Sequence, residues 1–543
     1  MSRSLHGAAI VAERLRSAGV DTLFGLPGVH NLALYQACHD VGLKIITNRH
    51  EQGAAYAADG MARATGRLGV ALTTTGPGAT NAITAIGEAW ASHSPVMLIA
   101  TDVPTSSRTK GVYRGGLHEC IDQQAMFRPV VKQTFVCESV EQIASAIEEA
   151  IELALAAPQG PVYVEIPTDL LTANCDLSLT MPRVHISEAE PTPANWLQDC
   201  LDLLKVSKRP IVWVGGGGCD ASSEIEALID KLKAPVITTF HARNILPKGH
   251  PALIPVPPHE PVVARLIDQA DLVLVIGSDL DGMMTQKWKM HLPKPRIAIN
   301  VDGSDAVKNY AMDLVVVANS KIALAKLSAA LPGRDRAWAP HGEAIEKEVF
   351  DELTSNSDTA ESIQFLRSTA SSLASDSIVF ADMAVCGYWL SSYYSVSGPR
   401  FLHYPMGWGT LGFALPAAVG AAAVCKEPVV TFCGDGGALF ALSELATIAQ
   451  EKIPLTIVVV DDSGYGMLRF GREKDPRIGT ELKSPDFTAV ARAFGIEAEC
   501  VEGVGDAYAS ALKRAVTARQ PRLLHVKARL YPPRTTSPRW PLA

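Results

Sequence analysis

Two acidic residues in the last third of the chain could hold a cation. Asp435 stands between glycines directly after the apolar run 429–433, and Asp462 follows the apolar run 453–460. Both runs indicate buried strands, and a right-handed crossover through a helix at 438–449 would bring their carboxyl ends together. The two carboxylates and a loop carbonyl could then bind Mg²⁺, while N–H groups at the start of the helix face a diphosphate.

A second set of candidates lies near the N-terminus. Glu51 begins the segment 51–58, which is poor in charge and is expected to form a buried helix, so its carboxylate needs a partner. The segments 49–55, 75–81 and 408–418, together with the two acidic segments, resemble thiamine-diphosphate enzymes of the acetolactate synthase, pyruvate oxidase and 2-oxo acid decarboxylase superfamily. The motifs occur in the order found in that superfamily, and the resemblance extends over nearly the whole chain.

The resemblance implies thiamine diphosphate and Mg²⁺ as cofactors. Glu51 would share a proton with N1′ of the aminopyrimidine, whose 4′-imino group then removes the C2 proton within the same molecule. The Gly409 carbonyl would accept a hydrogen bond from the 4′-amino group, and Leu411 would prop the two rings together. The metal would be held by Asp435, Asp462 and Gly464, and the other cofactor-binding candidates are Thr75, Gly76, Asn81, Gly436, Gly437, Tyr465, Gly466 and Met467.

Several positions bear on the reaction itself. Val29 stands where some decarboxylases of the superfamily carry Asp or Ser, and His30 follows it as a candidate replacement. His118 aligns with the active-site glutamine of the synthases and oxidases, where an imidazole could move a proton, although a structural histidine is the alternative. Arg469 matches an arginine of acetolactate synthases, but their tryptophan two residues later is Gly471 here.

The segments 25–30 and 116–126 look most like decarboxylases acting on 5-guanidino-2-oxopentanoate. The leading prediction is therefore a carbon–carbon lyase that decarboxylates a 2-oxo acid to an aldehyde and carbon dioxide, through a C2 ylide and an enamine. The sequence does not indicate which 2-oxo acid is used. An acetolactate-synthase-like carboligase and an inactive cofactor-binding subunit are the alternatives.

Strands alternate with helices throughout the 543 residues, which predicts an α/β fold with three doubly wound parallel-sheet domains. Polar and Pro-rich stretches near 171–195 and 332–359 are expected to be linkers. A Pro-rich C-terminal tail could be a lid or a disordered end. The predicted units are a pyrimidine-binding domain at 1–175, a Rossmann-like middle domain at 190–335, a diphosphate-binding domain at 358–530 and the tail at 531–543.

Two features of the middle domain argue against further cofactors. The glycine run 215–218 is followed by Asp220 where a dinucleotide motif needs glycine, which argues against NAD and predicts a tight turn. The segment 250–261 has no glycine, unlike the corresponding segment of flavin-bound relatives, which argues against FAD.

Composition narrows the partners and the compartment. A net charge of −8 argues against nucleic acid, and no apolar run is long enough to cross a membrane. The segment 4–15 is expected to be an amphipathic helix without a signal-peptide core, which places the protein in the cytoplasm. In the superfamily the pyrimidine domain of one subunit faces the diphosphate domain of another, which implies a homodimer or homotetramer with active sites between subunits.

The pair Asp461 and Asp462 replaces the usual Asn-Asn of the superfamily. The additional negative charge beside a diphosphate and its cation predicts a stronger dependence on the cation.

Overall fold

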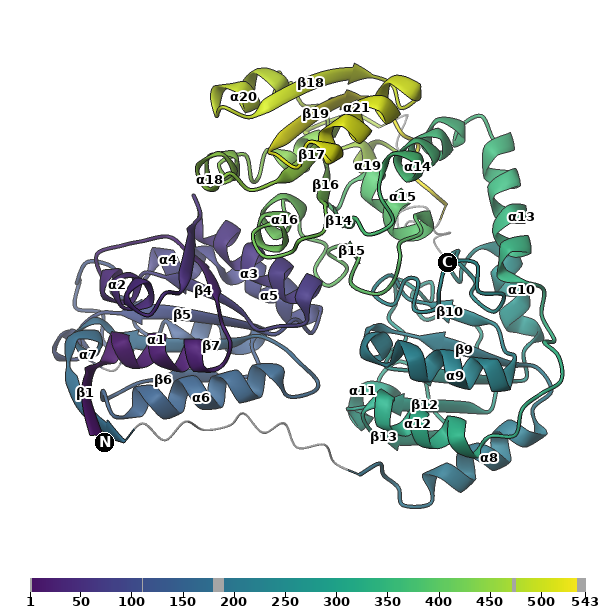
Figure 1. Cartoon of the computed structure of the whole chain (residues 1–543), viewed down its shortest axis with the longest axis horizontal. Helices are drawn as coiled ribbons and strands as arrows, with labels where there is room; N and C mark the ends of the chain where they lie inside the picture. Colours follow the sequence, from purple (N-terminus) through teal and green to yellow (C-terminus); the bar gives the residue numbers. More distant parts are fainter. Residues whose placement is uncertain (1, 110, 179–189, 471–474, 535–543) are drawn as a thin grey trace.

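The structure, a computed structural model, describes residues 2–109, 111–178, 190–470 and 475–534. Three parallel sheets with helices packed on both faces form an N-terminal, a middle and a C-terminal domain (Figure 1). This arrangement confirms the predicted α/β class. The N-terminal and middle domains lie side by side in Figure 1, and the C-terminal domain lies above them.

The N-terminal domain is built on a six-stranded sheet in the order β3-β2-β4-β5-β7-β6, in which all neighbouring strands are parallel. Helices cover both faces, so the central strands are apolar and buried. The strands are β2 (Thr22–Gly25), β3 (Lys44–Thr47), β4 (Gly69–Thr73), β5 (Val96–Asp102), β6 (Thr134–Val136) and β7 (Val162–Pro167). The helices are α1 (Gly7–Ser17), α2 (Leu32–Asp40), α3 (Glu51–Thr65), α4 (Pro77–Asn81), α5 (Ile83–Ala91), α6 (Gln142–Leu155) and α7 (Thr168–Thr172), with 3₁₀ turns η1 (Thr105–Ser107), η2 (Gln124–Met126) and η3 (Arg128–Val130).

The N-terminus begins as a strand, so the prediction of a helix from residue 4 is wrong at its start. Residues of β1 (Ser2–His6) pair antiparallel with β8 (Asn174–Ser178), and α1 follows only from residue 7. The His6 ring accepts a hydrogen bond from the N–H of Ala9, which caps α1. Because β8 supplies backbone partners, the first residues form a ladder instead of another helical turn.

The middle domain holds a five-stranded parallel sheet in the order β10-β9-β11-β12-β13. The predicted tight turn after β9 is present, and Gly217 lies against the backbone of Gly277 at the end of β11. The strands are β9 (Pro210–Val214), β10 (Val236–Thr238), β11 (Leu272–Ile276), β12 (Arg296–Asn300) and β13 (Leu314–Val317). The helices are α8 (Trp196–Val206), η4 (Gly216–Ala221), α9 (Ser222–Leu232), α10 (Pro261–Gln269), α11 (Gly303–Val307) and α12 (Ser320–Ala330).

The C-terminal domain repeats the six-stranded parallel pattern in the order β15-β14-β16-β17-β19-β18. β16 and β17 are neighbours, as the crossover argument predicts, and Gly434 pairs with Val460 at their carboxyl ends. The strands are β14 (Ile378–Ala381), β15 (Leu402–His403), β16 (Val429–Gly434), β17 (Leu455–Asp461), β18 (Glu497–Glu502) and β19 (Arg522–Lys527). The helices are α14 (Ala360–Ser372), α15 (Val385–Tyr393), α16 (Ala414–Ala422), α17 (Asp435–Ala438), α18 (Glu444–Glu451), α19 (Gly466–Arg469), α20 (Phe487–Ala493) and α21 (Asp506–Thr517).

Two sequence expectations differ from the structure in this half. The helix expected at 438–449 is divided into α17 and α18, and between them Phe440 packs against Gly412. The segment expected to be a linker at 332–359 contains α13 (Gly342–Ser355), whose apolar face is buried. The predicted domain limits remain a proposal, with β8 extending beyond residue 175.

Helices α3 and α16 join the N-terminal domain to the C-terminal domain. A Cβ at Gly60 would overlap the carbonyl of Ala417, and one at Gly420 would overlap the carbonyl of Ala57. The two backbones therefore touch, and only glycine allows this approach. Just before α3, the Glu444 carboxylate accepts hydrogen bonds from the Asn48 side chain and from the backbone N–H of Arg49.

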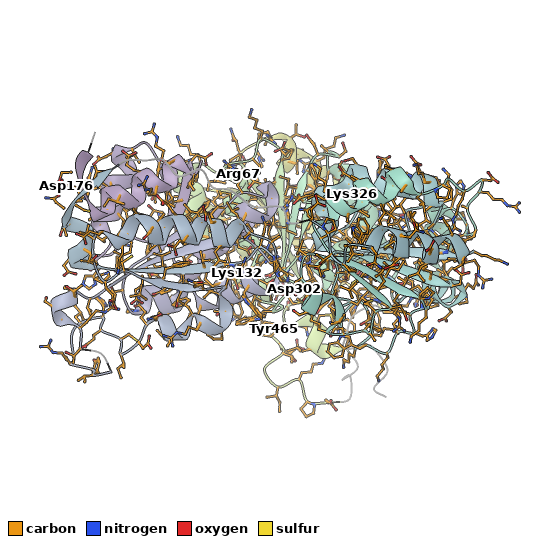
Figure 2. All side chains as sticks on the ribbon, turned by 90° about the horizontal axis from the view of Figure 1, so that it is seen from below. Arg67, Lys132, Asp176, Asp302, Lys326 and Tyr465 are labelled. Atoms are coloured by element: carbon orange, nitrogen blue, oxygen red, sulfur yellow. The ribbon has the colours of Figure 1, made fainter. Side chains whose placement is uncertain are left out.

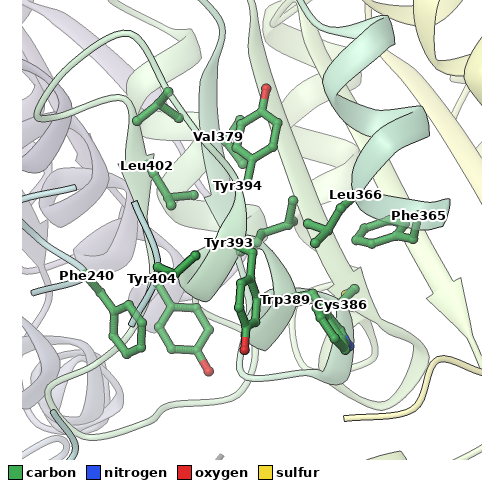
Figure 3. Close-up of a cluster of buried hydrophobic side chains, with 14 of the residues drawn as sticks. Phe240, Phe365, Leu366, Val379, Cys386, Trp389, Tyr393, Tyr394, Leu402 and Tyr404 are labelled. Carbon is green, nitrogen blue, oxygen red and sulfur yellow. The ribbon is translucent and has the colours of Figure 1, made fainter. Parts of the chain in front are cut away.

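Aromatic side chains join the middle and C-terminal domains. Figure 3 shows Phe240 of the middle domain beside Tyr404, with Tyr393 and Trp389 in the same cluster. The rings of Phe240 and Tyr404 are 6.3 Å apart. The Trp389 indole donates to the carbonyl of Tyr531 at 2.7 Å, so the cluster also holds the segment that leads to the C-terminus.

The C-terminal segment is anchored up to the last described residue. Arg534 bonds to Glu352 at 2.5 Å and to the buried Glu260. Most of the predicted tail, residues 535–543, lies outside the described residues. Within the described part of the chain, no helix combines the length and apolarity needed to cross a membrane.

Candidate active site

The predicted cation ligands lie at the carboxyl ends of β16 and β17. Asp435 begins α17, is 1% exposed and accepts a hydrogen bond from the Ser484 hydroxyl at 2.7 Å. Burial raises the pKa of Asp435, and burial together with the Asp435 charge raises the pKa of Asp462 to about 6. Two carboxylates that both resist ionisation form a site that a divalent cation would neutralise.

The predicted cation ligands, Asp435, Asp462 and the Gly464 carbonyl, do not form a metal site made of side chains alone. Among the described residues, no group of three or more His, Cys, Asp or Glu side chains could hold a metal ion. The predicted set has only two carboxylates, with the Gly464 carbonyl as the third ligand. Diphosphate oxygens would have to complete the coordination.

Asp461 is turned toward a different partner. Its Oδ2 lies 2.8 Å from Nε2 of His525, and its Oδ1 accepts from the N–H of Ser463. Burial would raise the pKa of Asp461, but the hydrogen bonds from His525 and Ser463 lower it below its usual value. The additional charge that distinguishes this chain from the usual Asn-Asn pair is therefore shared with His525.

Arg469 holds the loop after β17 in place through bonds to its backbone carbonyls. Its guanidinium donates to the carbonyls of Asp462 at 2.8 Å and Ser463 at 2.5 Å, and it lies 3.2 Å from Glu481. Arg469 is only 6% exposed. The arginine that suggested a synthase thus supports its own loop, and Gly471 lies outside the described residues.

The other candidates of this loop are close to Asp435. The ring of Tyr465 lies against Gly436, and the backbone N–H of Tyr465 donates to the carbonyl of Thr480 at 2.9 Å. Figure 2 shows Tyr465 near the middle of the long axis of the molecule. Gly466 lies against the Asp462 carboxylate, and Met467 packs on the core of the domain.

Asp382 connects two of the predicted cofactor segments and was not among the predicted site residues. This fully buried carboxylate accepts from the N–H of Gly412 at 3.0 Å and occupies the space beside Gly437. Burial raises the pKa of Asp382 to about 6. Half-buried Leu411 and the Gly409 carbonyl therefore belong to a loop that is fixed next to the start of α17.

A second carboxylate holds the same loop from the N-terminal domain. Glu88, which is fully buried, accepts from the N–H groups of Gly407 at 3.2 Å and Trp408 at 2.9 Å. Arg63 lies 3.3 Å from Glu88 and also pairs with Asp59 at 2.7 Å. The charge of Glu88 is thus compensated inside the domain contact.

The N-terminal set begins with Glu51, the first residue of α3. Its carboxylate is 6% exposed and accepts a hydrogen bond from the Asn81 side chain at 3.0 Å. The other oxygen faces Gly78, where a Cβ would come within 3.3 Å. The buried carboxylate expected from the sequence is therefore present, with Asn81 as its partner.

The two candidate histidines face each other. The rings of His30 and His118 are 5.5 Å apart and nearly perpendicular. Nδ1 of His30 lies 2.7 Å from the hydroxyl of Thr75, which lies 3.0 Å from the hydroxyl of Thr101. Burial and the neighbouring His118 lower the pKa of His30, so its neutral form prevails at pH 7.

The absence of a side chain at Gly76 allows the backbone of His118 to come close enough for its ring to face His30. The carbonyl of His118 lies so close to Gly76 that a Cβ there would come within 2.6 Å. His118 itself has a φ of 65°, which is uncommon for a residue other than glycine. The structure thus brings together the N-terminal candidates Glu51, Asn81, Thr75, Gly76, His30 and His118, and the C-terminal candidates as a second set in another domain.

The two sets follow the carboxyl ends of strands in two parallel sheets, which is the arrangement expected from the sequence for a cofactor-dependent enzyme. Three family models match the chain: the N-terminal TPP binding domain of thiamine pyrophosphate enzymes at residues 5–126, the central domain at 197–327 and the C-terminal TPP binding domain at 382–526. The chain belongs to the thiamine pyrophosphate enzyme family, and thiamine diphosphate is its cofactor.

Relatives in this family include decarboxylases and synthases. The chain is 32% identical to a probable 2-ketoarginine decarboxylase of Pseudomonas aeruginosa over 91% of this chain and 89% of the relative. It is 30% identical to a probable acetolactate synthase large subunit of Methanocaldococcus jannaschii over 96% and 92%. The solved 4-hydroxybenzoylformate decarboxylase of Rhodococcus jostii, 24% identical, has the same fold with a TM-score of 0.83 over 97% of this chain and 99% of that one.

The residues fit thiamine diphosphate. Glu51 is a buried carboxylate with a side-chain partner on one oxygen, and Asp435 stands among glycines at the start of α17, where backbone N–H groups can face an anion. The buried Oδ1 of Asp382 has no hydrogen-bond partner among the described residues and lies in the same region. Of the additional residues here, Asp382 directly follows the apolar run that forms β14, which was its one sequence signal, whereas Ser484 and Glu88 carry none.

Proposed function

We propose that the protein decarboxylates a 2-oxo acid without oxidation, releasing an aldehyde and carbon dioxide. The observation that carries this proposal is the facing pair of His30 and His118 beside Gly76. Decarboxylation requires a proton for the carbon that loses its carboxylate, and imidazole exchanges protons near neutral pH. The similarity to a probable 2-ketoarginine decarboxylase supports the same reaction class.

Thiamine diphosphate, when bound, would supply a nucleophilic carbon and an electron sink for a departing carboxylate. Asp435, Asp462 and the Gly464 carbonyl would hold Mg²⁺, and Arg469 keeps this loop in place. The remaining predicted contacts to the cofactor are Gly436, Gly437, Tyr465, Gly466, Met467, Gly409, Leu411, Thr75, Gly76 and Asn81.

Glu51 would exchange a proton with N1′ of the aminopyrimidine through the oxygen that faces Gly78, while the Asn81 side chain donates to the other oxygen. The Thr75 hydroxyl holds Nδ1 of His30, so we assign Nε2 to exchange a proton with the substrate. His118 would deliver the proton to the carbon that has lost carbon dioxide. The two histidines thus divide the proton transfers of one turnover.

We also propose the assembly and the compartment. A homodimer or homotetramer would place Glu51 of one subunit and Asp435 of another in the same site, because family enzymes pair these domains between subunits. The protein would work in the cytoplasm on small 2-oxo acids, without nucleic acid, membrane or FAD.

Carboligation of two 2-oxo acids is the second candidate. It is favoured by the similarity to probable acetolactate synthases and by the presence of Arg469. The contacts of Arg469 with the carbonyls of its own loop weigh against a role of this arginine in substrate binding. Both reactions begin with the loss of carbon dioxide and differ only in what captures the product carbon.

Product analysis tests the proposal. The purified protein with thiamine diphosphate and Mg²⁺ is given pyruvate, phenylglyoxylate or 5-guanidino-2-oxopentanoate, and NMR and carbon dioxide release are followed. An aldehyde equal in amount to carbon dioxide is expected. A 2-hydroxy-2-methyl-3-oxo acid or another acyloin as the main product would establish carboligation instead. If none of the three 2-oxo acids gave a product or carbon dioxide, an inactive cofactor-binding subunit would be favoured.

A further inference from the structure

The segment between β5 and η2 carries His118 and crosses the surface of the N-terminal domain. It leaves the sheet at Asp102 and returns at Gln123, and many of its side chains are exposed, among them Leu117 at 81%. Such a segment has few apolar contacts of its own. Its position over the sheet must therefore come from specific bonds at its ends.

Both ends are bonded to one buried carboxylate. Glu165 lies in β7 and is completely inaccessible to solvent. Its Oε1 is 2.6 Å from the Arg108 guanidinium, and its Oε2 accepts from the Gln123 side chain at 3.2 Å and the Tyr163 hydroxyl at 2.8 Å. One oxygen thus holds the first part of the segment, and the other holds its end.

We call the bonds of Glu165 with Arg108 and Gln123 the anchor of this segment. Arg108 and Gln123 each make further bonds that extend it. Arg108 also pairs with Asp102 at 2.6 Å, where the segment leaves the sheet. Gln123 accepts from the N–H of Gly76 at 2.6 Å and donates to the carbonyl of Thr101 at 3.1 Å. The same network therefore reaches the residues that hold His30 and pack against His118.

We propose that Glu165 is a positioning residue for catalysis, which holds the segment 103–123 at both ends so that His118 faces His30. This role rests on the proposed function, because it assumes that His118 moves a proton. Glu165 does not touch the substrate. It acts through Arg108, Gln123 and the backbone at Gly76.

The charge of Glu165 gives this anchor a pH dependence. The titratable groups that face Glu165 are Asp102, Arg108, Tyr163 and Cys137. Burial and the neighbouring Asp102 raise the pKa of Glu165 to about 7. As the pH falls through this value, Glu165 takes up a proton and its bond with Arg108 weakens, so turnover should decline on the acid side.

Two variants test the anchor in the full-length protein with thiamine diphosphate and Mg²⁺. Arg108→Ala removes the first contact, and Glu165→Gln removes the charge while keeping the shape. We expect faster amide hydrogen exchange at residues 111–120 in both. We also expect kcat to fall by about tenfold to a hundredfold with little change in KM, because small displacements of a catalytic group have effects of this size. The acid limb of the kcat profile near pH 7 should disappear in Glu165→Gln.

Three further measurements make the test specific. Arg108→Lys keeps the charge and should restore part of kcat, and the double variant should be no slower than the slower single variant. Arg67→Ala is the matched control, because it removes an exposed pair with Asp21 in the same domain and should change neither exchange nor kcat.

Unchanged exchange and unchanged kcat in folded Arg108→Ala would overturn the proposal, and so would additive losses in the double variant. Arg108 is partly exposed, so this variant keeps the test valid even where Glu165→Gln does not fold. If the wild-type protein decarboxylates no 2-oxo acid, the proposed function fails separately, and hydrogen exchange at 111–120 still decides whether the anchor exists.

Discussion

The N-terminal and C-terminal domains share one architecture and use it for different chemistry. Each has a six-stranded parallel sheet, and candidate residues follow the carboxyl ends of its strands. In the N-terminal domain these residues are Glu51, two histidines and hydroxyl groups, which are suited to moving protons. In the C-terminal domain they are crowded carboxylates, which are suited to a cation. The fold sets the place of the site, and the side chains set its chemistry.

Burial acts in the same direction on both sites. It raises the pKa of Asp462 to about 6 and lowers the pKa of His30, so both groups are shifted toward their uncharged forms. Burial therefore makes the charged form of each group less stable, and the two sites differ in how a charged form would be stabilised. A cation would stabilise the ionised carboxylates permanently, whereas the histidine gains or loses its proton during each turnover.

The largest effect should follow from breaking the C-terminal site. Asp435→Ala removes a carboxylate at the start of α17, so we expect loss of the thermal shift caused by thiamine diphosphate with Mg²⁺ and loss of all cofactor-dependent turnover. Differential scanning fluorimetry and carbon dioxide release measure both. Asp21→Ala, an exposed carboxylate of the N-terminal domain, serves as the control. A normal thermal shift in Asp435→Ala would remove Asp435 from the cation site.

Breaking the N-terminal site should separate chemistry from binding. Glu51→Gln keeps the size of the side chain and its contact with Asn81, so the thermal shift should remain. Turnover should fall by about a hundredfold to ten-thousandfold, since a proton exchange is lost. NMR measurement of the exchange of the cofactor C2 proton should show the same loss. Full turnover in this variant would disprove the role of Glu51.

A smaller effect should come from the histidine pair. His118→Ala should lower kcat by about tenfold to a hundredfold and leave the thermal shift intact, because it removes one proton transfer. Rapid-mixing absorbance and carbon dioxide release should place the delay after loss of carbon dioxide. His39→Ala, an exposed histidine in α2, is the matched control. Kinetics identical to the wild type would make His118 a structural residue.

The smallest effect is a pH dependence of Mg²⁺ binding at the C-terminal site. A cation would bind ionised Asp462, and a proton would compete with it below the raised pKa of about 6. The Mg²⁺ concentration for half saturation should therefore rise by up to about tenfold per pH unit below pH 6 and be constant above pH 7. Titrations from pH 5 to 8 followed by fluorimetry would measure it. A flat profile would show that Asp462 is not a ligand.

Much of the C-terminal site could be predicted because its residues follow apolar strands. The runs that form β16 and β17 are short, the first ends at Gly434, and crossover handedness makes the two strands neighbours. The division between α17 and α18 was not predictable, because it depends on Phe440 packing against a glycine from a distant segment. The strand at residues 2–6 was missed for the same reason, since its partner lies beyond residue 173.

The residues that hold the site in place gave no sequence signal. Glu165 and Glu88 lie within apolar segments, where a single charge looks like an interruption of the pattern. Their partners come from other elements and appear only in three dimensions. The contacts of Arg469 were not predictable either, because its match to a synthase arginine gave no sign that its guanidinium bonds to a carbonyl of its own loop.

The contact between α3 and α16 also has a consequence for the order in which the protein is made. Helix α3 ends at Thr65, whereas the helix that covers it begins only at Ala414. At ribosomal speeds, the intervening chain takes on the order of tens of seconds to synthesise. During that time the alanine- and glycine-rich face of α3 is without its partner. The newly made N-terminal domain should therefore be a client of chaperones that bind chains during translation.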